Sequence, residues 1–222
     1  MLAPITNAEH AIQAANRFTR LQTVSAPSSA ALVKVADDVT PFLGERNVGK
    51  QAWRVEYNNS SLKFASALVD FTDPYRRAFT VMLKADNGRL LFVTSTYEGP
   101  RDPDMRPMPS CGVATEQLSN DEEVYDGYPD DYPAIDFLGA LEAVLNGGSG
   151  SPFQAKEIHG AYVMHSRMGS APKPAWTITL RGLPPLPVRS PSVPKWQRNH
   201  MRNVVDAMTG KVLFATNSPQ PV

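Results

Sequence analysis

The sequence predicts an α+β fold of two repeated units, each with one helix packed on an antiparallel β-sheet. Three observations predict it. A strand–turn–strand pattern occurs twice, at 83–94 and 205–216, and a tryptophan strand precedes each copy. Trp53 and Trp176 are 123 residues apart, and a helical apolar stripe precedes each of them. A repeat of this length is a domain-sized unit, so the sequence indicates a tandem duplication.

The two hairpins are predicted from their glycines and from the apolar runs that follow. Gly88 and Gly210 are each expected to close a two-residue turn, because glycine adopts a positive φ without a steric penalty. The runs after them are β-prone. Trp53 and Trp176 begin a Trp-x-aliphatic pattern that predicts strands with one buried face, so both indoles are expected in the core.

A helix is predicted near the start of each half. Thr6 and Glu9 form a capping-box pattern. The first apolar stripe contains Ile12, Ala15, Phe18 and Leu21, and adding 123 gives Ile135, Leu138, Leu141 and Val144. The second helix is expected over 133–146, with Pro133 in its first turn and Gly147 and Gly148 at its end.

Other segments have weaker patterns. Residues 75–81 and 159–165 predict strands, whereas 30–36 fits a short helix or a strand equally well. Residues 168–174 predict a loop, and the prolines of 182–194 predict an extended loop. The predicted organisation is therefore a first unit at 1–97, a linker rich in proline, tyrosine and acidic residues at 98–129, and a second unit at 130–222.

Charge is balanced overall but unevenly distributed. Lys plus Arg equals Asp plus Glu at 22 each, which gives no reason to expect nucleic-acid binding. Residues 100–149 carry 2 basic and 11 acidic side chains, whereas 150–222 carry 9 basic and 2 acidic ones. Two interpretations follow: the acidic linker lies against the basic second half, or one of these surfaces meets a charged partner.

Composition limits the class of protein. Cys111 is the single cysteine, so no intrachain disulfide forms. No apolar run approaches the ~20 residues of a membrane span. The first residues lack a basic segment followed by an apolar one, which predicts either a cytoplasmic protein or a signal peptide already removed.

A helix, a Trp-x-Val/Ile strand and a Val-Asp-Ala-x-Thr-Gly-Lys-Val-Leu hairpin together resemble the PepSY domain. The second half matches at Trp176, Ile178, Val205, Asp206, Ala207, Thr209, Gly210, Lys211, Val212 and Leu213. The first half matches at Trp53, Val55, Ala85, Gly88, Leu90 and Leu91, with Lys84 where the family usually has an acid. Residues 6–12 also resemble the start of such a domain.

The resemblance implies a cystatin-like fold, a location outside the cytoplasm or at the cell envelope, and an association with peptidase inhibition or regulation. A cytoplasmic protein is the alternative location. The resemblance covers roughly two-thirds of the chain, and its motifs are mostly structural. Fold similarity alone is a weak argument for function.

The sequence predicts no catalytic residues, no cofactor and no metal site. No nucleophile signature surrounds Cys111. His159 and His165 would lie about 20 Å apart on one strand, too far for one metal ion. The acidic residues of 121–131 lack the spacing of a calcium loop, and 147–150 follows a helix and lacks the lysine of a phosphate loop.

The candidate partner-binding residues are Lys195, Trp196 and Arg198, together with Tyr125 and Tyr128 of the linker. An aromatic side chain flanked by cations on a loop is typical of interface anchors. Trp196 packing against its own domain is the alternative. The sequence therefore favours a non-enzymatic module that binds or regulates a protein partner, such as a peptidase. A structural accessory subunit of a cell-envelope assembly is the alternative, and an enzyme with an unrecognised site is the third hypothesis.

Overall fold

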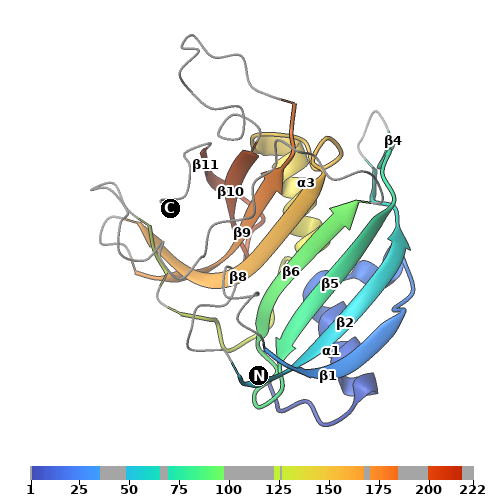
Figure 1. Ribbon diagram of the computed structural model, residues 1–222. Helices are drawn as coiled ribbons and strands as arrows, with labels where there is room; N and C mark the ends of the chain where they lie inside the picture. Colours follow the sequence, from blue (N-terminus) through green and yellow to red (C-terminus); the bar gives the residue numbers. More distant parts are fainter. Residues whose placement is uncertain are drawn as a thin grey trace.

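The computed structural model describes residues 2–35, 49–65, 70–97, 123–125, 127–167, 171–184 and 200–216. Most of their strands form one antiparallel sheet with strand order β1-β2-β5-β6-β8-β9-β10-β11, and β7 also pairs with β8 (Figure 1). The strands of this sheet are β1 (Ser29–Lys34), β2 (Gln51–Ser60), β5 (Arg77–Lys84), β6 (Leu90–Tyr97), β7 (Glu123–Tyr125), β8 (Glu157–Arg167), β9 (Lys173–Arg181), β10 (His200–Asp206) and β11 (Val212–Thr216).

The prediction of two repeated helix-on-sheet units is wrong, because the two halves share one sheet. β6 ends the first half and pairs with β8 of the second half, through Val93 opposite Gly160 and Ser95 opposite Ile158. Two separate sheets would leave these edge N–H and C=O groups without ladder partners, whereas the joined sheet pairs them. The α+β class is correct in its coarser sense: in the part of the chain that the structure describes, two α-helices pack on a sheet.

Both helices cover the same face of the sheet (Figure 1). α1 (Ala8–Thr19) packs on β1, β2 and β5, and α3 (Phe137–Gly147) packs on β9, β10 and β11. The core beneath them is one cluster that crosses the junction between the halves. Within it, the ring centroid of Phe79 lies 6.2 Å from that of Phe137, and Phe18 lies 6.1 Å from Tyr162. The shared core is a second reason why the halves do not separate.

The helix ends differ from the predicted ones. The N-cap of α1 is Asn7, whose side chain accepts a hydrogen bond from the backbone N–H of His10, so Thr6 does not cap. α3 begins after the N-cap Asp136, which leaves Pro133 outside the helix. The glycine end is confirmed: Gly148 is the C-cap and its N–H donates to the carbonyl of Val144. Among the described residues, neither helix is long and apolar enough to cross a membrane.

The predicted burial of Trp53 and Trp176 is confirmed, at 9% and 0% exposed. Each indole N–H donates to an isoleucine carbonyl just before a helix, at 3.1 Å to Ile5 and 2.7 Å to Ile135. These isoleucines are 130 residues apart, so the helices are not offset by the predicted 123. Ile135 consequently lies ahead of α3 instead of in its apolar stripe.

The two hairpins have longer turns than predicted but use their glycines as expected. Residues 85–88 and 207–210 form the turns, so each contains four residues instead of two. Gly88 has φ +71° and Gly210 has φ +74°. Glycine is required because a side chain in this left-handed region is strained.

Gly88→Ala is expected to destabilise the protein more than Gly210→Ala. Both substitutions strain the turn by about 1 kcal/mol. A Cβ on Gly88 would also collide with the backbone carbonyl oxygen of Ala3, whereas a Cβ on Gly210 would meet only the Ile135 side chain, at 3.7 Å. Urea denaturation of the two variants measures the difference. Equal losses would show that Ala3 moves away freely.

Several segments become defined only in the structure. Residues 30–34 of the ambiguous 30–36 segment belong to edge strand β1. Strands β3 (Lys63–Ala65) and β4 (Asp70–Thr72) form a separate two-stranded sheet that was not predicted. The end of the predicted linker contributes β7, which pairs with the last residues of β8. Most of that linker and of the 182–194 loop lie outside the described residues.

Candidate functional site

The predicted partner-binding residues are not brought together by the described part of the structure. Lys195, Trp196 and Arg198 lie outside it, as does Cys111. Tyr125 is in β7, where it pairs with His165 of β8, and Tyr128 is half-buried just after that strand. A Trp196 site therefore stays a prediction.

The face of the sheet that carries no helix has a different composition from the core face. Side chains alternate between faces along a strand. In β9, Trp176, Ile178 and Leu180 are fully buried in the core, so Thr177, Thr179 and Arg181 lie on the opposite face. A small apolar cluster also lies on this helix-free face in the first half; it comprises Val33, Val35, Ala52, Met82, Leu91 and Phe92.

A row of polar side chains crosses the helix-free face from one edge strand to the other. Each strand of the eight-strand path contributes one directly paired residue: Ser29, Glu56, Thr80, Thr94, His159, Thr179, Arg202 and Thr216. We call this set the polar row. Neighbouring strands are about 4.8 Å apart, so the row is roughly 34 Å long before curvature. All of its members except Ser29 are half-buried.

Charges concentrate where the polar row crosses β8, β9 and β10. Two residues along β9 from Thr179, and on the same face, Arg181 lies opposite Glu157 of β8 and His200 of β10. Its Nη1 lies 2.8 Å from Oε2 of Glu157. The guanidinium of Arg202 lies 5.8 Å from the ring centroid of Phe214. His159 and Arg202 belong to the polar row, and Arg181 and His200 lie beside it on the same face. We call these four residues the basic end of the row.

His159 is held in its neutral form at neutral pH. Burial lowers the pKa of its imidazole, and the nearby Glu157 carboxylate, 3.5 Å away, opposes this shift only in part. The side chain is 11% exposed. Burial also lowers the pKa of Arg181, again opposed by Glu157, which indicates a partly desolvated site.

Acidification is expected to destabilise the folded protein through His159. Since the native pKa is below the unfolded value of about 6.5, the unfolded chain binds the proton first. The contribution of His159 to stability is therefore complete above that pH and decreases as the pH falls toward the native pKa. Denaturation of wild type and His159→Gln at pH 7.5 and 5.5 measures it. The variant should lose less stability between these pH values; equal losses would exclude a role for His159.

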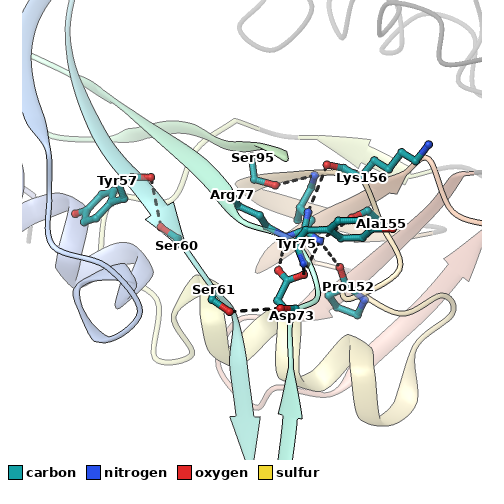
Figure 2. A network of polar contacts seen from close by, with 11 residues as sticks. Tyr57, Ser60, Ser61, Asp73, Tyr75, Arg77, Ser95, Pro152, Ala155 and Lys156 are labelled. Atoms are coloured by element: carbon teal, nitrogen blue, oxygen red, sulfur yellow. Dashed lines mark hydrogen bonds and ion pairs between the residues drawn. The ribbon is translucent and has the colours of Figure 1, made fainter. Parts of the chain in front are cut away.

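A second polar cluster is fully buried at the junction of the halves (Figure 2). The Arg77 guanidinium forms an ion pair with Asp73, and both side chains are 0% exposed. Arg77 also donates to the backbone carbonyls of Ala155 at 2.7 Å and Pro152 at 3.2 Å. Because its donors are used within the protein and no solvent reaches it, this cluster is a structural tie instead of a reactive site.

A groove of about 400 Å³ lies beside edge strand β1. It is lined by Ile5, Thr6, Leu32, Lys50, Gln51, Trp53, Ala85 and Asp86. Leu32 is 48% exposed there, while Trp53 is 9% exposed. The groove is open and mixed in character, and it contains no pair of side chains arranged for acid–base chemistry among its lining residues.

Metal ligation has no support within the described ranges, where no group of three or more His, Cys, Asp or Glu side chains converges.

The sequence does not predict the polar row, because the members of the row come from eight segments. Alternation with apolar residues marks two of its members, Glu56 on the Trp53 strand and Thr179 on the Trp176 strand. The register between strands decides which residues align across the sheet. Alternation within one strand does not reveal that register.

Comparison with known proteins adds no family assignment, because no family model, curated protein or solved structure matches this chain. The PepSY resemblance consequently stays a prediction.

Proposed function

We propose that this chain is a non-enzymatic module that binds a protein partner on its helix-free face, along the polar row. The observation that carries the proposal is the row itself: one polar side chain per strand, aligned across the whole sheet. A solvated face requires polar residues but no such alignment across eight strands. Hydroxyl and imidazole groups at about 4.8 Å intervals offer both donors and acceptors.

The dimensions of the row favour an extended partner segment. A row of roughly 34 Å corresponds to about ten residues of extended chain. The half-buried setting of the row strengthens each hydrogen bond relative to bulk water. PepSY-like ancestry, an extracytoplasmic location and a peptidase as partner belong to this proposal and are supported by the sequence resemblance alone.

The test is partner capture that depends on the row. Tagged wild-type protein and a Thr94→Val/Thr179→Val variant would be incubated with envelope and soluble extracts, cross-linked and analysed by mass spectrometry. Valine keeps the shape of threonine and removes its hydroxyl, so the fold should persist; thermal denaturation checks this. The control is Thr23→Val, since Thr23 is exposed after α1 and its hydroxyl donates to the Arg20 carbonyl. Specific capture should fall in the double variant alone. Capture that is unchanged in that variant would reject the row as the binding site.

A further inference from the structure

We infer that β1 pairs with β1 of a second copy of this chain, which joins the two sheets edge to edge about a two-fold axis at Leu32. β1 is an edge strand of the described sheet: it pairs with β2 on one side, and no described strand lies beyond it (Figure 1). The inference concerns this edge and not the polar row, so it goes beyond the proposed function and can fail separately from it.

The backbone of β1 offers three residues to a further strand. In an antiparallel ladder, every second residue directs its N–H and C=O to the same neighbouring strand. The N–H of Val35 donates to the carbonyl of Lys50 at 2.9 Å, and the register of β1 with β2 continues unbroken from there. The odd-numbered residues therefore face β2, whereas Ala30, Leu32 and Lys34 direct their backbone groups outward. Such outward groups form a template for another strand.

β1 lacks most of the features that protect an edge strand from pairing. Proteins protect such strands with proline, charged side chains, bulges or short length. β1 contains no proline, Lys34 at its end is its single charged residue, and its six residues pair with β2 in unbroken register. At the other edge of the described sheet, β11 is shorter, and its register with β10 shifts between Val204 and Val205, as at a bulge. β1 is consequently the edge better suited to pairing.

A second copy of β1 complements the first when the two-fold axis passes through Leu32. The two leucines then lie directly opposite each other, and Lys34 lies opposite Ala30 of the other copy. No like charges meet in this register, whereas an axis at Lys34 would place two lysines opposite each other and destabilise the pair. On the helix-free face, Ala31 lies opposite Val33 of the other copy, which extends the small apolar cluster that contains Val33.

Leu32 gives the pairing an apolar contact. Its side chain is 48% exposed and lies on the helix-covered face, because Leu32 pairs with the core residue Trp53. The groove beside β1 is lined by Leu32, Trp53 and Ile5, so a second leucine at this position buries apolar surface. The chain also has no net charge, with 22 basic and 22 acidic residues, so two copies do not repel each other at long range.

Sedimentation velocity of the full chain at about 5 and 500 μM measures the association. The wild-type protein should shift from monomer toward dimer over this range. Leu32→Lys should weaken dimerisation at least about ten-fold, because two like charges then lie opposite each other. Leu213→Lys is the matched control, since Leu213 is a 40% exposed leucine on edge strand β11, and it should change the dissociation constant less than about two-fold. Circular dichroism at the lower concentration checks that both variants fold.

A cysteine cross-link tests the register of the two copies. In a Cys111→Ala background, which removes the single native cysteine, Leu32→Cys should form a covalent dimer when diamide is added as the oxidant. Opposite residues that exchange hydrogen bonds have Cα atoms about 5.5 Å apart, which is within the range of a disulfide. Ala31→Cys in the same background is the control, because the two copies of residue 31 are diagonal neighbours at about 7–8 Å and should not cross-link.

Three results would overturn the inference. A wild-type protein that stays monomeric at about 500 μM would leave β1 to the strand of a different protein. Leu213→Lys that weakens dimerisation as much as Leu32→Lys would indicate a contact through β11 or general charge repulsion. Equal cross-linking of Leu32→Cys and Ala31→Cys would reject the two-fold axis at Leu32. The capture experiment with the threonine variants decides the proposed function separately, because those threonines lie on β6 and β9.

Discussion

Arg77→Met is expected to lower the free energy of unfolding by about 3–5 kcal/mol, the range for breaking a buried ion pair by removing one partner. The substitution leaves the Asp73 carboxylate buried without its cation. It also removes the donor that the carbonyls of Pro152 and Ala155 share. Because Arg77 belongs to the first half and these carbonyls to the second, the loss should loosen the junction. Urea denaturation followed by circular dichroism measures the effect.

Arg76→Met is the matched control for this prediction. Arg76 is the exposed neighbour of Arg77 and donates to the side chain of Asn59 at 3.0 Å. Its replacement should change stability by no more than about 0.5 kcal/mol. Arg77→Lys should have an intermediate effect, since lysine keeps the charge but not the planar fork. A loss below about 1 kcal/mol in Arg77→Met would mean that the junction does not depend on this tie.

Gly160→Val is expected to destabilise the protein by about 3 kcal/mol, at the upper end of the usual range for overpacking a core. Gly160 lies where β8 meets β6, opposite Val93. A Cβ there would come within 2.5 Å of Cε2 of Phe137. Phe137 is fully buried and packs against Phe79 and Trp176, so its ring has no free space to move into. The same denaturation experiment measures the loss.

Ala161→Val supplies the control for the glycine. Ala161 is the next residue of β8, half-buried on the helix-free face opposite Thr177. Valine suits a pleated, half-buried position, so this change should be neutral within about 0.5 kcal/mol. If Gly160→Val were as harmless as Ala161→Val, the Phe137 ring would not be fixed against Gly160 at the β6–β8 junction, and the description of one shared core would be wrong.

Local patterns in the sequence determined most of the elements. The two helices, the strands at Trp53 and Trp176, the turn glycines and the glycine end of α3 are all present in the structure. These features depend on interactions between residues close in the chain, such as side-chain periodicity, φ preference and capping. The sequence also predicted the burial of both indoles, because a large apolar side chain on a strand with one buried face is expected on that face.

Errors arose where local rules admit more than one solution. Thr6 and Asn7 are both good N-cap residues, and the chain uses Asn7. The tryptophan spacing predicts a helix offset of 123 residues, whereas the indole contacts place Ile5 and Ile135 in equivalent positions. A difference of a few residues in the connecting segments is invisible in the apolar stripe, because the stripe repeats every three to four residues.

Only the tertiary structure decided how the halves combine and where the candidate site lies. The repeat in the sequence is compatible with two sheets or one, and the pairing of β6 with β8 selects one. That pairing aligns His159 with Thr94, completes the polar row, and brings Arg77 to the carbonyl of Ala155. Pairing between distant strands depends on which edges find hydrogen-bond partners and how much apolar surface the joined core buries. The sequence by itself thus determined the strands and helices, and long-range pairing determined the face on which they present a site.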